Sequence, residues 1–315
     1  MRIALVTTSY PAFPGDPSGH FVESEARRLA RDADVRVVTT GSPRSVSGDQ
    51  DAVTVWRGGG GSAFGWPGVA ARVRENPLRL VSAASWVQRA RATLRGQPGV
   101  DRIVAHWALP SAFPIAVGLG VPLEIVSHGG DVRLLTHLPS LARSAALDRL
   151  LRDAHRWRFV SHALHDELAA SLSSHHRARL AAIAFVAAPA IDLPDVAAET
   201  ARRRNARGEG RLVVCVGRLV ASKRFDRALD HVARESRAGR KASVVVVGDG
   251  PDRARLETLA RTLGVDVRFV GRATREDALA WIGAADGLLH ASRAEGLSTV
   301  VREAEALGVP VVHIA

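Results

Sequence analysis

Two glutamates near the end of the chain have a spacing that suits ligand binding. Glu295 and Glu303 enclose a stretch that begins Glu-Gly-Leu-Ser and follows the short apolar run from Gly287 to Ala291. Ser298 is a favourable helix N-cap, so the free amides of the first helical turn can attract a phosphate. The carboxylates can accept hydrogen bonds from ribose or sugar hydroxyls. The alternative is a surface helix that carries two solvated glutamates.

A pair of cations forms a second set of chemically useful residues. Arg218 and Lys223 follow Gly217 and the apolar run from Leu212 to Val216. A guanidinium and an ammonium together can neutralise two phosphates and a leaving group, whereas as generic surface charges they would have no function. Turns that contain glycine follow the next two apolar runs, and their residues are Gly248, Gly250, Gly271 and Arg272.

The first half has a polar cluster at the end of another apolar run. His128, two glycines and Asp131 follow directly after Ser127. Open α/β sheets bind ligands at the carboxyl ends of their strands, which favours a functional histidine here over a structural one. His106 also ends an apolar run and is a weaker candidate. Gly19 precedes an amphipathic stretch, where it either lets the backbone approach an anionic ligand or forms a plain turn.

The elements that must position these residues alternate between strands and helices. The predicted strands are 3–7, 35–39, 53–57, 102–106, 122–127, 157–161, 182–187, 212–216, 243–247, 267–270, 287–291 and 310–315. Helical patterns begin near Phe21, Ala163, Phe225, Asp252, Arg275 and Ser298. Such alternation predicts parallel sheets in an α/β protein. We expect two doubly wound domains, residues 1–190 and 211–315, joined by a linker at 191–210.

Composition limits the class of protein. The chain has 315 residues, of which 46% are hydrophobic, and a formal net charge of +11. This charge favours anionic partners, but no finger, RNP or basic-helix motif occurs, so we expect no nucleic acid. The single cysteine, Cys215, lies in an apolar run, so we expect it in the core and the protein in a reducing, cytoplasmic compartment. No apolar run reaches the ~18 residues of a transmembrane helix.

The region from Pro67 to Arg95 combines arginines with a helical pattern that is broken near Pro77, and two tryptophans accompany it. The apolar positions that we place on one helix face are Leu80, Val81, Ala84, Val87 and Leu94. A basic amphipathic helix can lie on an anionic membrane. The alternative is an ordinary packed helix with a solvated face.

Together these motifs resemble those of a known family. Glu-Gly-x-Ser-x-x-x-x-Glu at 295–303, followed by Gly308 and Pro310, resembles the E-x7-E signature of the retaining GT-B glycosyltransferases of family 4, the glycosyltransferase group 1 proteins. The stretches at 128–131 and 217–223 also resemble family motifs. The resemblance implies the GT-B fold, two Rossmann-like domains that face each other across a cleft. Since the family continues beyond the last strand, we expect a shortened chain and an incomplete second domain.

The resemblance also implies roles for individual residues. The implied catalytic residues are His128, Glu295, Arg218 and Lys223. The implied substrate-binding residues are Gly19, Asp131, Gly217, Gly248, Gly250, Arg272, Gly296, Leu297, Ser298, Thr299 and Glu303. Arg218 and Lys223 would grip the diphosphate, and Glu303 would hold the ribose. Glu295 and His128 would orient the sugar, and Arg272 would lie beside the nucleotide base.

The function that the resemblance implies is transfer of a sugar from a UDP- or GDP-sugar to a saccharide or lipid-linked acceptor. Configuration would be retained, the nucleotide sugar would be a substrate, and neither a metal nor a cofactor would be needed. Peripheral contact with the inner face of an anionic membrane is a further expectation. Two alternatives stay open, a sugar-nucleotide epimerase of the same fold and an inactive nucleotide-binding protein.

Overall fold

The computed structural model describes residues 1–42, 46–48, 53–64, 69–207, 210–292 and 297–314. The chain divides into two compact units. The first holds Met1–Ala12 and Ser18–Ala190, and the second holds Phe13–Pro17 and Ile191–Ala315. Each unit has its own sheet, and the predicted alternation of strands and helices is confirmed in both.

The first unit is built on a mostly parallel sheet. Its described strands run in the order β3-β4-β2-β1-β5-β6-β7-β8. They are β1 (Arg2–Val6), β2 (Asp34–Thr39), β3 (Val46–Gly48), β4 (Val53–Arg57), β5 (Arg102–His106), β6 (Leu123–Ser127), β7 (Ala154–Phe159) and β8 (Ala184–Val186). Among these described strands only β3 pairs antiparallel, with β4. Our sequence patterns did not predict this short strand.

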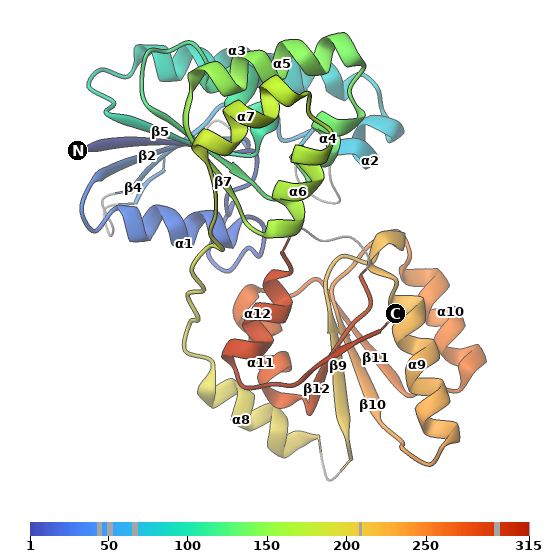
Figure 1. Cartoon of the computed structure of the whole chain (residues 1–315). Helices are drawn as coiled ribbons and strands as arrows, with labels where there is room; N and C mark the ends of the chain where they lie inside the picture. Colours follow the sequence, from blue (N-terminus) through green and yellow to red (C-terminus); the bar gives the residue numbers. More distant parts are fainter. Residues whose placement is uncertain (43–45, 49–52, 65–68, 208–209, 293–296, 315) are drawn as a thin grey trace. The chain divides into compact units, whose positions relative to one another are not determined.

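Helices cover both faces of this sheet, with α1 on one face and α3, α5 and α7 on the other (Figure 1). The helices are α1 (His20–Leu29), α2 (Val69–Glu75), α3 (Arg79–Gly96), the kinked, irregular segment η1 (Ala108–Ala116), α4 (Gly130–His137), α5 (Ser140–Asp153), α6 (His162–Ala170) and α7 (Ser174–Ile183). Because both faces are covered, the side chains from Ile3 to Val6 in β1 are each 0% exposed. This burial explains the continuous apolar sequence of the strand.

The second unit has a smaller sheet whose described strands are all parallel, in the order β11-β10-β9-β12-β13. They are β9 (Leu212–Val216), β10 (Ser243–Val247), β11 (Val267–Gly271), β12 (Gly287–His290) and β13 (Val311–His313). The helices are α8 (Ala197–Ala206), the 3-10 helix η2 (Ala221–Lys223), α9 (Phe225–Arg237), α10 (Arg253–Leu263), α11 (Arg275–Ala284) and α12 (Thr299–Ala306).

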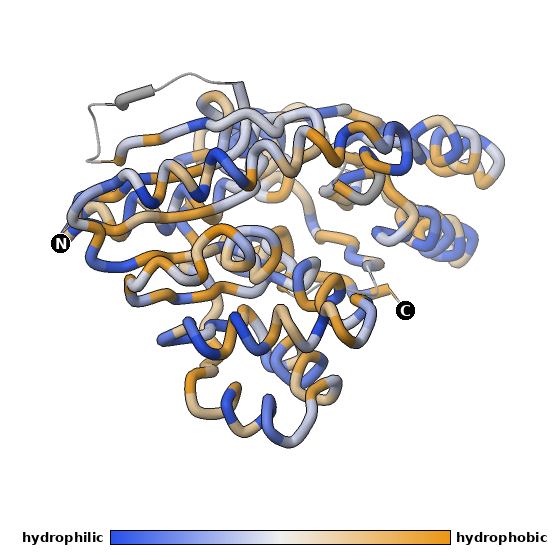
Figure 2. The backbone as a smooth tube through the Cα atoms, turned by 90° about the horizontal axis from the view of Figure 1, so that it is seen from above, coloured by the Kyte–Doolittle hydropathy of each residue, from blue (hydrophilic) through white to orange (hydrophobic). Residues whose placement is uncertain are grey.

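Alternate residues of β9 enter two cores on opposite faces of this sheet. Leu212 and Val214 pack with residues of α11 and α12, whereas Val213 and Cys215 pack with α9 and α10. Figure 2 shows that hydrophilic and hydrophobic stretches alternate along the helices, as expected for helices that bury one side and expose the other. The prediction that Cys215 is a core residue is confirmed, since it is 1% exposed. Burial raises the pKa of its thiol to about 12.

Residues 191–210, where we expected a linker, contain helix α8 and group with the second unit. The helix packs against α11. Arg203 donates to Asp277 Oδ1 at 2.6 Å, and its guanidinium lies 4.5 Å from the ring centroid of Trp281. These contacts join helix α8 to helix α11, so most of the segment is part of the second unit.

The helical break near Pro77 is confirmed, because α2 ends at Glu75 and α3 begins at Arg79. Two residues of the predicted apolar face of α3 are exposed, Leu80 at 56% and Val81 at 69%. Leu94 of that face is buried, together with Trp86 and Ala90, which we had not placed on it. The reason is tertiary, because Trp86 reaches the sheet and donates its indole N–H to Thr39 O at 3.1 Å. No helix in the described ranges has the length and apolar character needed to cross a membrane.

Candidate functional site

The first unit gathers polar side chains at the carboxyl ends of β5 and β6. Asp131 is 2% exposed and lies in the first turn of α4. Its Oδ1 accepts from the backbone N–H groups of His128 at 3.1 Å and Gly129 at 3.0 Å, and its Oδ2 accepts from Ala108 N at 2.8 Å. These bonds join the loop after β6 to the start of η1, so Asp131 positions the backbone of His128.

The imidazole of His128 is half-buried among aromatic rings. Its centroid lies 4.9 Å from the ring of Phe21 and 5.0 Å from that of Trp107. His106 stacks on it at 5.1 Å, and its Nδ1 lies 2.9 Å from His128 Nε2. The sequence signalled His106 only weakly, through its place at a strand end, whereas the fold puts it in direct contact with His128.

Both imidazoles are held in the neutral form. Burial, followed by the positive charge of Arg158, lowers the pKa of His106 to about 3. Burial also lowers the pKa of His128 well below its ordinary value, with His106 and Arg158 acting in the same direction against Glu25. Each ring therefore has one N–H and one lone pair at neutral pH.

Gly19 is the N-cap residue of α1 and has a φ of 73°. A Cβ at this position would lie 2.4 Å from Ser9 O, closer than atoms can pack. The glycine is therefore required by the chain's own backbone, which folds tightly here to begin the helix that holds Phe21.

In the second unit, three glycines let two loops meet at the ends of β9 and β10. A Cβ on Gly248 would lie 1.9 Å from Gly217 O, and one on Gly250 would lie 2.2 Å from Leu219 O. Leu219 N also donates to Asp249 O at 2.9 Å. These contacts brace the loop that contains Arg218, so Gly248 and Gly250 support the predicted site through its backbone.

Arg218 lies close enough to Lys223 for its charge to lower the pKa of the Lys223 ammonium. Burial lowers the pKa of Lys223 to about 8, and the charge of Arg218 acts in the same direction. Burial also lowers the pKa of Arg218. Two neighbouring cations that have lost part of their hydration form a favourable place for a polyanion.

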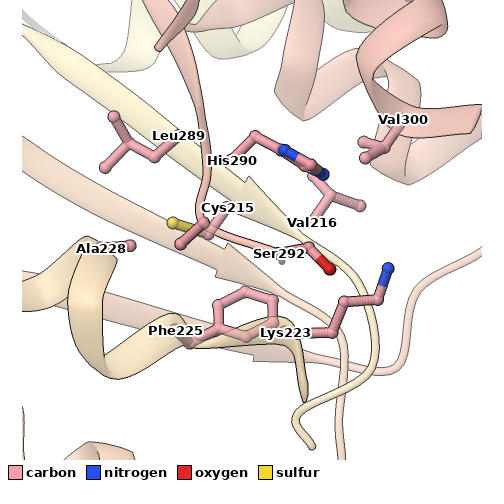
Figure 3. Close-up of a pocket in the computed structure, with 10 residues that line it drawn as sticks. Cys215, Val216, Lys223, Phe225, Ala228, Leu289, His290, Ser292 and Val300 are labelled. Carbon is pink, nitrogen blue, oxygen red and sulfur yellow. The ribbon is translucent and has the colours of Figure 1, made fainter. Parts of the chain in front are cut away.

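Lys223 lines a small pocket between the ends of the strands β9 and β12 and the start of α12. In Figure 3 the amine of Lys223, the hydroxyl of Ser292 and the imidazole of His290 lie toward one side of the pocket. The residues that line the pocket are Cys215, Val216, Lys223, Phe225, Ala228, Leu289, His290, Ala291, Ser292 and Val300.

His290 and Ser292 were not singled out from the sequence, although His290 ends β12 and therefore had the same strand-end signal as His128. Burial, followed by the charges of Lys223 and His313, lowers the pKa of His290. The imidazole can therefore offer a neutral hydrogen-bonding group beside the ammonium.

The start of α12 borders this pocket through Val300. Ser298 is the N-cap residue and Thr299 begins the helix, as predicted, but the Ser298 hydroxyl does not cap it. Its Oγ is buried without a hydrogen-bond partner among the described residues. Leu297 precedes it, whereas Glu295 and Gly296 lie outside the described residues.

Glu303 is 7% exposed and forms an ion pair within its own unit. Its Oε1 accepts from Arg275, with Nε at 3.2 Å and the terminal nitrogen at 3.1 Å. The sequence did not predict this partner, because Arg275 lies 28 positions away.

Arg272 lies just beyond β11, with its side chain 55% exposed. Its terminal nitrogen is 3.6 Å from Asp16 Oδ1, and Asp16 belongs to the 13–17 segment of the second unit. The structure therefore brings Arg272 to an acidic neighbour, and its expected place beside a base stays a prediction. Within the described ranges, no three His, Cys, Asp or Glu side chains converge as metal ligands would.

Comparison with known proteins identifies relatives of this chain. Residues 197–315 match the family model described as Glycosyl transferases group 1. Alpha-D-kanosaminyltransferase of Streptomyces kanamyceticus is 29% identical over 248 residues, covering 72% of this chain and 62% of the relative. GDP-mannose-dependent alpha-mannosyltransferase of Mycobacterium tuberculosis (strain CDC 1551 / Oshkosh) is 31% identical over 231 residues, covering 70% of this chain and 57% of the relative. The chain thus spans less than two thirds of these relatives.

Solved structures share the fold. Sucrose-phosphate synthase (tll1590) from Thermosynechococcus elongatus superposes with a TM-score of 0.76 at 18% identity, covering 99% of this chain and 80% of that one. Anabaena Alr3699/HepE in complex with UDP-glucose gives a TM-score of 0.69 at 18% identity, with the same coverage. The predicted GT-B fold, with two Rossmann-like parallel sheets, is confirmed by these likenesses.

Proposed function

This chain belongs to the glycosyl transferases group 1 family, and from this premise we propose that it moves a sugar from a nucleoside-diphosphate sugar to an acceptor. The observation that carries the proposal is the pair of Arg218 and Lys223, whose pKa values are both lowered by burial. A diphosphate beside them would restore the electrostatic stabilisation that burial removes. Relatives named for GDP-mannose and a fold neighbour with UDP-glucose support this donor class.

In the proposed reaction the two cations stabilise the departing diphosphate, as a preorganised electrostatic site does. The free amides at the start of α12 add hydrogen-bond donors. Glu303 holds the ribose, with its carboxylate oriented by Arg275. Glu295 and His128 orient the sugar.

The stereochemical proposal is retention of configuration. The departing phosphate accepts the proton of the acceptor hydroxyl while the new glycosidic bond forms, so no separate protein nucleophile is needed. We also propose that neither a metal nor a cofactor takes part, and that the acceptor is a saccharide or a lipid-linked saccharide.

Titration calorimetry with UDP, GDP and their sugars tests the donor proposal. We expect one nucleoside diphosphate to bind, with its sugar bound at least as tightly. If no nucleoside diphosphate or nucleotide sugar binds, the proposal is wrong. Incubation of the bound donor with an acceptor panel, followed by NMR of the anomeric centre, tests transfer and retention, while conversion of the donor without an acceptor would indicate an epimerase.

The first unit offers a surface for a membrane-associated acceptor. Leu78 is 75% exposed and neighbours the exposed Leu80 and Val81, while Arg74 and Arg79 lie on the adjoining helices. Apolar side chains beside arginines can insert among anionic headgroups. We therefore propose weak peripheral contact with an anionic membrane through this surface, which we call the α2–α3 surface.

A further inference from the structure

A chain of buried polar side chains lies behind His128. His106 Nδ1 is 2.9 Å from His128 Nε2, and His106 Nε2 is 3.7 Å from Glu25 Oε2. The other oxygen of Glu25 accepts a hydrogen bond from Arg158, whose Nε lies 3.4 Å from Glu124 Oε1. His106 is 0% exposed, and Glu25 and Arg158 are each 8% exposed. The series therefore runs from the half-buried imidazole into the core.

The fold assembles this series from separate elements. Helix α1 provides both Phe21, which contacts the ring of His128, and Glu25, which is one helical turn further on the same face. The strands β5, β6 and β7 are neighbours in the sheet and provide His106, His128 and Arg158 at or near their carboxyl ends. Helix α1 thus contacts the half-buried ring of His128 through Phe21 and faces the buried ring of His106 through Glu25.

The arrangement selects one proton position on each ring. His106 Nε2 is buried and forms no hydrogen bond within the described part of the chain, and the nearest carboxylate oxygen given for it is Glu25 Oε2 at 3.7 Å. A carboxylate attracts an N–H and repels a lone pair, so the proton of neutral His106 belongs on Nε2. Its Nδ1 then holds the lone pair, and His128 must donate from Nε2.

We propose that Glu25 and His106 are positioning residues that hold His128 in the Nε2–H tautomer and leave its Nδ1 as a hydrogen-bond acceptor. In the sugar transfer proposed above, on which this role depends, Nδ1 accepts a hydrogen bond from a hydroxyl of the transferred sugar. A ring with the opposite tautomer would donate from Nδ1 instead, so the sugar hydroxyl would have to accept and the direction of this hydrogen bond would be reversed.

NMR of the unmodified protein, labelled with ¹⁵N in its histidines, tests the proton positions without any substrate. Long-range ¹H–¹⁵N spectra at neutral pH distinguish the two neutral tautomers and the imidazolium by their nitrogen shifts. We expect both His106 and His128 as Nε2–H tautomers. A His128 ring that holds its proton on Nδ1, or on both nitrogens, would overturn the proposal.

Two isosteric variants test whether Glu25 is the cause. Glu25→Gln removes the carboxylate that faces His106, whereas the matched control Glu124→Gln removes a charge from the far side of Arg158. We expect mixed tautomers of both rings in Glu25→Gln and unchanged tautomers in Glu124→Gln. Unchanged tautomers in both variants, or an equal change in both, would refute the role of Glu25. If Glu25→Gln fails to fold, the spectrum of the unmodified protein still decides the tautomer.

The kinetic consequence is measured on the same variants. Loss of one neutral hydrogen bond to the sugar costs about two- to tenfold, so Glu25→Gln should lower kcat/KM for the nucleotide sugar by about this factor while the affinity for the free nucleoside diphosphate stays constant. Glu124→Gln should retain the original kcat/KM. A chain with the expected tautomers and no transferase activity would refute the proposed function alone, whereas an active chain with the wrong tautomer would refute only this inference.

Discussion

The two units hold their candidate site residues in opposite electrostatic states. In the first unit burial keeps His106 and His128 neutral, and in the second it leaves Arg218 and Lys223 as cations whose pKa values are lowered. Neutral hydrogen-bonding groups suit hydroxyls, whereas paired cations suit phosphates. We therefore propose that the first unit positions the sugar and that the second unit binds the diphosphate.

The largest effect is expected when both cations of the second unit are removed. Each charged hydrogen bond contributes about 1.5–3 kcal/mol, so Arg218→Ala with Lys223→Ala should weaken nucleoside-diphosphate binding by about 10²- to 10⁴-fold. Titration calorimetry measures the change. Lys241→Ala is the control, because Lys241 is the other lysine of the chain and is exposed. Unchanged affinity in the double variant would rule out the assignment.

The next effect separates the two glutamates by the part of the donor that each contacts. Glu303→Gln should weaken free nucleotide and nucleotide sugar alike by about 10- to 100-fold, since each loses a charged contact of about 1.5–3 kcal/mol. Glu295→Gln should weaken only the nucleotide sugar and lower kcat more than affinity.

Folding must be checked first by thermal melting, because Glu303 is nearly buried and paired with Arg275. Removing one partner of a buried ion pair costs about 3–5 kcal/mol of stability. Equal loss of free-nucleotide affinity in both glutamate variants would mean that the donor lies differently over α12.

A smaller effect is the pH dependence of the cationic site. The pKa of Lys223 is about 8, so the ammonium is mostly charged at pH 7 and mostly neutral at pH 9. Diphosphate binding requires the charged form, so affinity should fall by about tenfold between these pH values. Lys223→Arg keeps its charge and should flatten the curve. A wild-type affinity that is constant over this range would contradict the proposed contact.

The smallest expected effect concerns membrane binding. We assign the contact with the membrane to the first unit alone. Vesicle flotation at low salt should show weak binding to anionic lipid that decreases at high salt, where charges are screened. Leu80→Ser with Val81→Ser should weaken it by roughly fivefold, on the order of 1 kcal/mol for partly inserted side chains. Leu141→Ser is the control, since Leu141 is 86% exposed on α5. An equal effect of the control would show that the α2–α3 surface is not specific.

Much of the architecture followed from local sequence patterns. The apolar runs predicted the described strands of both sheets except β3, and the helix starts near Phe225, Arg275 and Ser298 agree with α9, α11 and α12. Their positions just after predicted strands also identified His128 and Arg218 as candidate site residues. These features depend on periodicity and on the residues at element ends, which are properties of short stretches of chain.

What the sequence alone determined about this protein is therefore its α/β class, its family and the residues at the ends of its strands. Only the tertiary structure decided which of those residues meet. It paired Glu303 with Arg275, buried Trp86 of α3 while Leu80 stayed exposed, and connected His128 through His106 to Glu25. Each of these contacts depends on which strands and helices become neighbours, a choice made by long-range packing that no local pattern of residues records.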